Sequence, residues 1–144
     1  MKLLTVKELQ AKIAEAEGAK ASAALKAMQA EEEEKRALLE RLTKPSGLSD
    51  EEVMEKASII INRAVENGQM SVQVFRFPHS LCSDNGRAIN QAEAGWEKTL
   101  TGIPKEIHDF WKRQLQPRGY HIRYETINYP GGMPGDIGII LSWG

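Results

Sequence analysis

The chain of 144 residues contains a single cysteine, Cys82. One cysteine cannot form a disulfide within the chain, which excludes the class of small secreted domains stapled by disulfides. Apolar runs reach only three residues, as at 59–61 and 139–141, whereas about 20 are needed to span a bilayer. The first twelve residues lack the unbroken apolar stretch of a signal peptide. We therefore expect a cytoplasmic protein with no membrane partner.

The sequence also lacks an excess of either charge. It has 19 Lys+Arg against 20 Asp+Glu, a formal net charge of −1, which excludes a highly basic packaging protein and a polyacidic tail protein. Aromatic residues make up only 6% of the chain, and all of them lie at Phe75 or later. The apolar core is therefore expected in the C-terminal part, and the N-terminal third is a different kind of structure.

The first 48 residues have the composition of a long helix. Ten of them are alanine, and alanine, glutamate, lysine and leucine are strong helix formers. Thr5 and Glu8 have the spacing of a capping box, and Pro45-Ser46-Gly47 interrupts the pattern. We expect a helix from Thr5 to about Thr43, with Gly18 as a candidate bend. The predicted parts are a helical extension (1–44), a linker (45–48) and a compact domain (49–144).

The sequence leaves two roles open for this helix. Neither of its heptad registers keeps large apolar residues at the seam for three or four heptads, as a strong coiled coil requires, although small alanines let two helices approach closely. The helix is therefore either a loosely self-associating element or a solvated extension. The run Glu31–Glu34 is interpreted as a solvated stretch rather than as a metal-binding patch.

The segment 49–144 begins with a second capping box, Ser49 with Glu52, which predicts a helix ending near Gly68. Residues 70–77 are rich in strand formers and end at Pro78. Simple alternation would place Val72 and Val74 on one face of this strand and Phe75 and Phe77 on the other.

The rest of the domain is read as helices followed by two strands. Residues 79–103 carry mixed signals, since Ser80, Ser83 and Asp84 can start a helix while nearby glycines interrupt one. Another helix is expected from Pro104 to about 116. Residues 120–127 alternate and 137–143 form a terminal strand, so these two are expected to pair as an antiparallel hairpin. The fold class is α+β: a long N-terminal helix and a small two-layer domain with the order helix, strand, helix or helices, strand, strand.

A basic interval is the main candidate binding site. No acidic residue lies between Asp109 and Glu125, so cations in this interval could neutralise phosphates while an aromatic ring stacks on a base. The alternative is an ordinary solvated surface, and residues 49–144 carry 10 Lys+Arg against 12 Asp+Glu, a net charge of −2. The candidate residues are Lys112, Arg113, Arg118, Tyr120, His121 and Arg123.

No catalytic residue, metal ligand or cofactor is predicted. His79 and Cys82 could belong to a thiol or zinc site, but they lack the paired spacing of strong zinc motifs, and a buried thiol beside a surface histidine is the simpler interpretation. The glycine-rich loop 130–136 is not followed by a helix, so it is interpreted as a turn rather than an anion site. The Gly-x-Ser-x-Gly and Gly-x-Gly-x-x-Gly motifs are absent from the sequence.

One resemblance rests on structural residues. It includes Gly119-Tyr120-His121-Ile122 after a helix, then Gly138-Ile139-Ile140-Leu141-Ser142-Trp143, preceded by Ala64–Gly68 leading into Ser71–Val74. Over about residues 60–144 this pattern resembles small α+β proteins of uncharacterised function encoded by tailed bacteriophages and related bacterial loci. The long insertion between Pro78 and Thr101 departs from it. The resemblance implies a virion-associated or accessory component and carries over no catalytic residue.

The sequence thus favours a non-enzymatic interaction or structural accessory protein, related to phage proteins, whose helix mediates self-association or docking onto a protein partner. The alternative is a nucleic-acid-binding module that uses the basic interval Lys112–Arg123.

Overall fold

The computed structural model describes residues 3–144, and the chain divides after Leu38 into two compact units. The first unit consists of most of helix α1, Val6–Thr43. The helix begins with the expected capping box: the Glu8 amide donates to Thr5 Oγ1 over 3.2 Å, and the Thr5 amide donates to Glu8 Oε2 over 3.3 Å. It continues through Gly18 without interruption. At 1.5 Å per residue, its 38 residues span about 57 Å.

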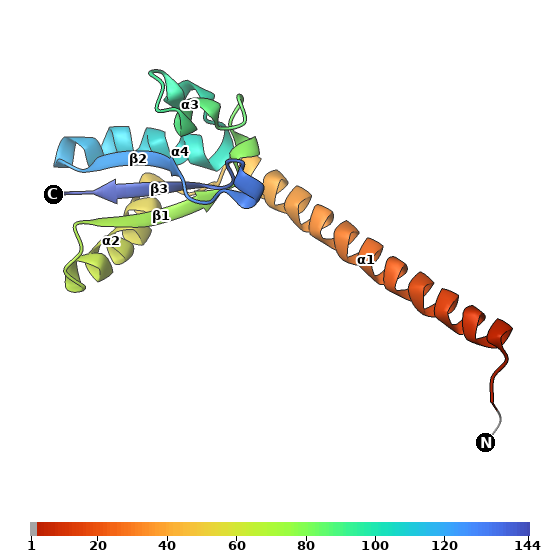
Figure 1. The fold of residues 1–144 in the computed structure, drawn as a ribbon. Coiled ribbons are helices and arrows are strands. Elements are labelled where there is room, and N and C mark those ends of the chain that lie inside the picture. Colours follow the sequence, from red (N-terminus) through yellow and green to blue (C-terminus); the bar gives the residue numbers. More distant parts are fainter. Residues whose placement is uncertain (1–2) are drawn as a thin grey trace. The chain divides into compact units, whose positions relative to one another are not determined.

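The second unit, Leu39–Gly144, is the α+β domain (Figure 1). Its helices are α2 (Asp50–Glu66), α3 (Arg87–Asn90) and α4 (Gly102–Phe110), and its strands are β1 (Ser71–Phe77), β2 (His121–Thr126) and β3 (Ile137–Ser142). A π-helical turn, Trp111–Leu115, and a short 3-10 turn, Gln116–Arg118, extend α4. The last turn of α1 belongs to this unit, and its Leu39 and Leu42 pack against the core.

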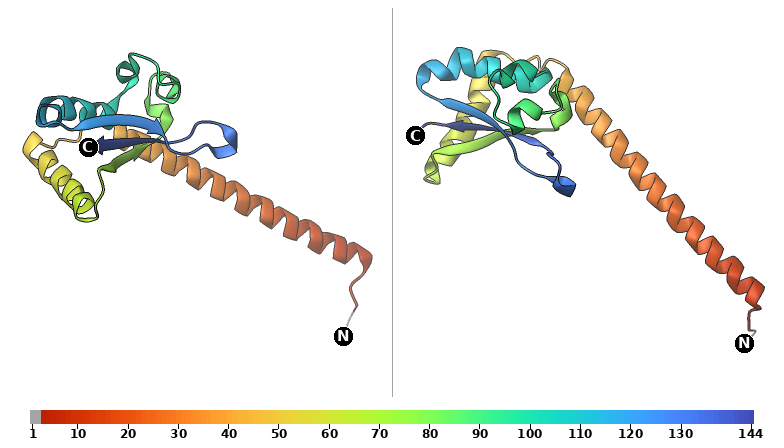
Figure 2. Two further views of the ribbon diagram at one scale, coloured as in Figure 1. Left: turned by 60° about the vertical axis from the view of Figure 1, so that its left-hand side comes forward. Right: turned by 45° about the horizontal axis from the view of Figure 1, so that its top comes forward.

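The sheet has the order β1-β3-β2, so the last strand is the central one and is antiparallel to both neighbours. The predicted hairpin of β2 and β3 is confirmed. The connecting loop is closed by backbone bonds from Ile127 to Asp136 and from Gly135 to Asn128, both 2.9 Å. The helices of the domain lie on one side of the sheet (Figure 2), as the two-layer prediction requires.

Alternation along β2 divides the sheet into a buried face and an open face, although Ile140 of the central strand, which pairs with Arg123 on the open face, is also buried. In β2, Ile122 and Tyr124 pair with Leu141 and Ile139 on the buried face. His121, Arg123 and Glu125 are exposed on the other face, which is the division that the sequence predicts.

The expected division of β1 is wrong beyond Val74. The register shifts between Gln73 and Phe75, so one extra residue is inserted and the strand changes phase. As a result, Val72 and Phe77 lie on the same face, opposite Leu141 and Ile137.

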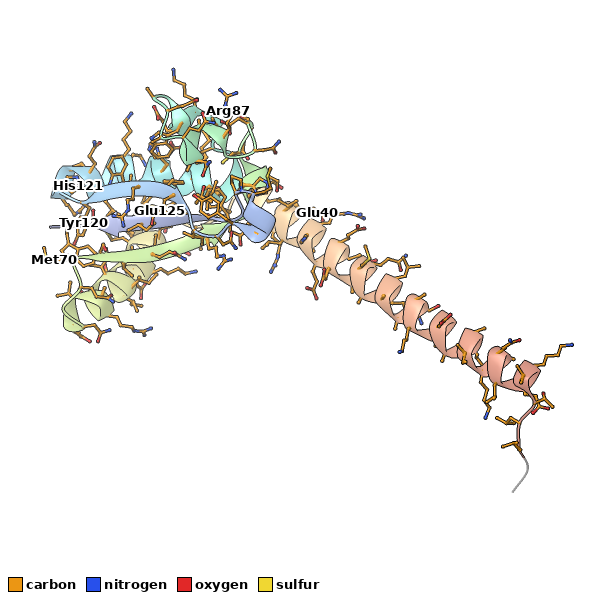
Figure 3. All side chains as sticks on the ribbon, in the orientation of Figure 1. Glu40, Met70, Arg87, Tyr120, His121 and Glu125 are labelled. Atoms are coloured by element: carbon orange, nitrogen blue, oxygen red, sulfur yellow. The ribbon has the colours of Figure 1, made fainter. Side chains whose placement is uncertain are left out.

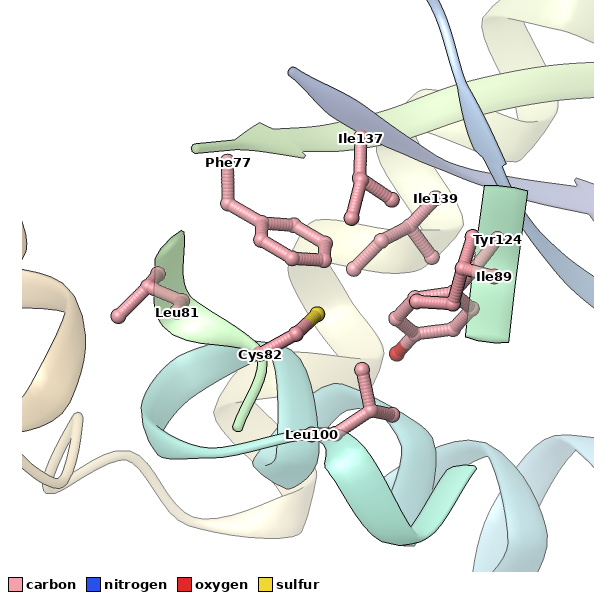
Figure 4. Packing of buried hydrophobic residues seen from close by; sticks show 8 residues of the cluster. All are labelled: Phe77, Leu81, Cys82, Ile89, Leu100, Tyr124, Ile137 and Ile139. Atoms are coloured by element: carbon pink, nitrogen blue, oxygen red, sulfur yellow. The ribbon is translucent and has the colours of Figure 1, made fainter. Parts of the chain in front are cut away.

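Burial is concentrated around the centre of β3. Ile137 and Ile139 have no exposed surface, and Phe77 is 1% exposed. These side chains meet residues of the 79–103 segment in one cluster (Figure 4), whose members are Phe77, Leu81, Cys82, Ile89, Leu100, Tyr124, Ile137 and Ile139. A second cluster joins α2 and α4 to the sheet through Ile61, Phe110, Leu115 and Leu141.

The segment 79–103, which the sequence leaves ambiguous, contains α3 and two short 3-10 turns rather than one helix. Asp84 caps α3, since its carboxylate accepts hydrogen bonds from the amides of Gly86 and Ala88, both 2.9 Å long. The chain then turns through Gly95, with φ of +81°. The segment is held on the domain by Leu81, Ile89 and Leu100, each of which is buried in the core cluster against the sheet. A continuous helix is therefore not needed to fix its position.

Candidate interaction surfaces

Helix α1 has no buried residue. Its large apolar side chains before Leu38 are largely exposed to solvent: Leu9 is 46% exposed, and Ile13 and Met28 are each 59% exposed. The side chains of α1 project from the ribbon along its length (Figure 3). Isolated helices derive little stability from propensity alone, and most helices in proteins are stabilised by packing an apolar face. The exposed face of α1 is therefore a candidate contact surface.

The first half of the basic interval lies on the helix side of the domain. Lys112 and Arg113 are on the π-turn that continues α4, and Arg113 Nη2 is 2.9 Å from Asp50 Oδ1 at the start of α2. Gln114 Nε2 donates to the same carboxylate over 3.0 Å. The hydrogen bonds from Arg113 and then from Gln114 hold the pKa of Asp50 below its usual value, and the hydrogen bond to Asp50 raises the pKa of Arg113. Asp50 thus links the start of α2 to the helical turn that continues α4.

The middle of the interval is occupied by local contacts. Arg118 Nη1 donates to the backbone carbonyl of Gln114. Tyr120 is half-buried, with its ring centroid 6.3 Å from that of Trp143, and its carbonyl accepts a 3.0 Å hydrogen bond from the Trp111 indole. Tyr120 therefore packs at the edge of the domain core instead of standing free to stack on a base.

The end of the interval lies on the open face of the sheet. His121 and Arg123 are exposed there, and Arg123 Nε is 3.3 Å from Glu125 Oε2. The six candidate residues are therefore distributed over both sides of the sheet, because Lys112 and Arg113 lie on the helical turn that covers one face, whereas His121 and Arg123 point from β2 to the other face. Arg113 and Arg123 each have a carboxylate partner, so the interval does not form one continuous cationic surface.

His79 and Cys82 lie in different environments. Cys82 is 3% exposed in the main core cluster, and burial raises the pKa of its thiol to about 11. His79 Nδ1 donates to the carbonyl of Gly135 over 3.1 Å, beside the hairpin loop. A thiol that is buried and protonated is a poor nucleophile, so this pair has the properties of core and loop packing.

An aromatic cluster around His108 was not predicted from the sequence. The His108 ring lies 5.7 Å from that of Trp96 and 5.4 Å from that of Trp111. Burial lowers the pKa of His108. Tyr124, whose hydroxyl donates to the Pro104 carbonyl over 2.7 Å, completes the cluster. The His108 ring packs against two indole rings and the Tyr124 hydroxyl is hydrogen-bonded to the backbone. Both side chains therefore have a structural role in the cluster.

The second feature missed by the sequence is a cavity of about 560 Å³. It lies between α2, α4, strands β1 and β3, and the linker 45–48, and we call it the linker pocket. Its surface is mainly apolar; the principal contributors are Val53, Ile60, Val74, Ile107, Trp111 and Leu141. The sequence predicts the apolar faces of both helices, but only the tertiary structure leaves a space between them.

Within residues 3–144, no three His, Cys, Asp or Glu side chains gather where they could hold a metal ion. Over the same residues, no helix has both the length and the apolar character needed to cross a membrane. The chain matches no protein-family model, no curated protein and no solved structure.

Proposed function

We propose that this chain is a non-enzymatic interaction or structural accessory protein, and that α1 is the element through which it self-associates or docks onto a protein partner. The observation that carries the proposal is that α1 extends over 38 residues with none of them buried. Apolar side chains such as Leu9, Ile13 and Leu25 gain about 25 cal/mol for each Å² of surface removed from water on association. A second helix can supply that burial.

Sedimentation equilibrium of the full chain tests self-association. We expect an apparent mass above that of the monomer which rises with protein concentration. The double variant Leu9→Gln/Ile13→Gln should sediment closer to the monomer mass, since both apolar contacts are removed. The matched control Lys12→Gln/Glu15→Gln changes two polar residues of the same helix and should behave as the original chain. A full chain that stays monomeric at high concentration would remove self-association from the proposal.

We further propose a cytoplasmic, virion-associated or accessory role related to proteins of tailed bacteriophages. Support comes from the pattern at residues 60–144 described above, and from the single cysteine, which suits a reducing compartment. The gene neighbourhood tests this proposal. Adjacent capsid or tail genes are expected, whereas an operon of metabolic genes would contradict it.

The nucleic-acid alternative is less well supported by the geometry, because Arg113 and Arg123 are paired with carboxylates on different sides of the sheet. Nucleic-acid binding can be tested independently of self-association. If the basic interval binds DNA or RNA, binding should be lost with increasing salt and weakened by Arg118→Ala or Arg123→Ala. We expect no retention of either nucleic acid at low salt.

A further inference from the structure

The linker pocket has the size and lining of a small-molecule site. Ligand sites in proteins are typically hollows of about 300–1,000 Å³ with mainly hydrophobic walls and a few polar groups. The pocket has a volume of about 560 Å³. Its floor contains Val74 of β1 and Leu141 of β3, and α2 and α4 form its walls. The apolar body of a ligand would therefore replace water along most of its surface.

The charged residues of the pocket indicate which head group it would accept. Asp50 and Arg113 form an ion pair with each other. The remaining charges are the carboxylates of Glu106 and Asp109 and the ammonium of Lys56, a balance of −1. An anionic head group would be repelled by two carboxylates and attracted by one ammonium group. A cationic head group would be attracted by two carboxylates and repelled by one ammonium group, so the net charge of the pocket favours a cation.

Two further features support a cation. The amide of Ser46 donates to both carboxylate oxygens of Glu106, over 3.1 and 3.4 Å, which positions that carboxylate against the linker. Phe75, Phe110 and Trp111 line the same pocket, and the face of an aromatic ring attracts an ammonium group. Carboxylates together with aromatic rings are the groups that recognise amines.

We propose that the linker pocket binds a small cationic amphiphile, a molecule with an apolar body and one amine or quaternary ammonium head. The apolar body occupies the space between α2 and α4, and the head lies near Glu106 and Asp109. This site is independent of the role proposed for α1, because every residue that lines the pocket lies between Pro45 and Leu141.

The test uses the full chain and two probes with the same alkyl chain, decyltrimethylammonium and decyl sulfate, titrated calorimetrically below the concentrations at which they form micelles. We expect saturable, one-to-one binding of the ammonium probe, about tenfold tighter than that of the sulfate, which corresponds to about 1.4 kcal/mol. Circular dichroism at each end point verifies that the chain remains folded. Absence of saturable binding, or equal affinity for both probes, overturns the proposal.

Two sets of variants locate the site. Ala57→Leu adds bulk to the pocket wall and should weaken binding of the ammonium probe about tenfold, whereas Asn62→Leu, at an exposed position of the same helix, should leave it unchanged. The pair Glu106→Gln and Asp109→Asn should abolish the preference for ammonium over sulfate while the chain remains folded. Equal effects of the two leucine variants, or a preference that survives loss of both carboxylates, contradicts the proposed site.

Discussion

Along residues 3–38 no side chain is buried, whereas in Leu39–Gly144 the centre of β3 is withdrawn from solvent completely. Both parts contain a helix whose N-terminus is capped by a side-chain hydroxyl, Thr5 for α1 and Ser49 for α2. In the first, the hydrogen bonds and helix propensities are local, and they act between residues three or four positions apart. In the second, residues about 60 positions apart in sequence are joined, as in the pairing of Phe77 with Ile137. The same substitution should therefore have different consequences in the two parts.

The largest difference is expected from removing a large apolar side chain. Phe77→Ala deletes a ring that is 1% exposed and should lower the free energy of unfolding by about 3–5 kcal/mol. Ile13→Ala, at a position 59% exposed, should change it by no more than about 0.5 kcal/mol. Urea denaturation followed by tryptophan fluorescence measures both, since every Trp lies in Leu39–Gly144. Similar losses for the two variants would mean that α1 contributes to the domain core.

Replacing glycine by alanine should have opposite effects in the two parts. Gly102 has φ of +60°, and a Cβ there would overlap the carbonyl oxygen of Leu42. Gly102→Ala should therefore destabilise the domain by at least about 1–2 kcal/mol. Gly18 has no atom within 4 Å of such a Cβ, and Gly18→Ala should stabilise α1 by about 0.5–1 kcal/mol.

Thermal melting followed by far-ultraviolet circular dichroism measures both glycine variants. The melting temperature should fall for Gly102→Ala, and the helical signal should rise or persist to higher temperature for Gly18→Ala. A Gly102→Ala protein that melts like the original chain would show that the last turn of α1 can shift away from α4 at little cost.

Removal of a helix cap should have a smaller effect, again unequal between the parts. Asp84→Ala removes two 2.9 Å hydrogen bonds at the start of α3 and should cost about 1 kcal/mol. Thr5→Ala removes a bond at the exposed start of α1, so it should fray the first turn and leave the urea midpoint unchanged. Amide hydrogen exchange distinguishes fraying from global destabilisation. A lower urea midpoint for Thr5→Ala would contradict the local character of α1.

The smallest effect should come from the exposed ion pair of Asp50 and Arg113. The pKa of Asp50 is lower in the folded chain than its usual value of 3.8, so its contribution is present above about pH 4 and is lost as the pH falls through the folded pKa. Asp50→Asn should lower the melting temperature slightly at pH 7 and by less at pH 2, where more of the carboxyl group is protonated. Salt should diminish the difference.

The control for the ion pair is Glu15→Gln, which changes a carboxylate of α1 and should leave the melting temperature of the domain unchanged at both values of pH. A shift for Asp50→Asn that is equally large at pH 2 would show that the side-chain amide disturbs the start of α2 for a reason other than charge.

Features encoded by neighbouring residues could be predicted well. The capping box of Thr5 forms with both of its hydrogen bonds, and the Ser49 hydroxyl accepts from the Glu52 amide as expected, because each cap involves residues three positions apart. The alternation of β2 is also correct. The faces of β1 could not be assigned beyond Val74, since the bulge is defined by its register against β3, a strand more than 60 residues away.

The candidate site was less predictable than the fold. Lys112 and Arg123 belong to one interval of sequence, but the interval passes from a helical turn to a strand, and this change of direction separates its cations. The linker pocket was unpredictable for the opposite reason, because residues far apart in the sequence come together to form it. Its walls, such as those at Ile60 and Ile107, are distant in sequence, and nothing in either local pattern specifies the space between them.

The sequence alone determined the helical nature of residues 6–43, the concentration of aromatic residues in the C-terminal part, and the α+β class, because propensity, capping and periodicity are local properties. Only the tertiary structure decided that the last strand is central, that the basic interval is divided between two faces, and that the linker, α2, α4 and the sheet line a pocket. Those features depend on long-range strand register and on how two helices are spaced over a sheet, which no short segment encodes.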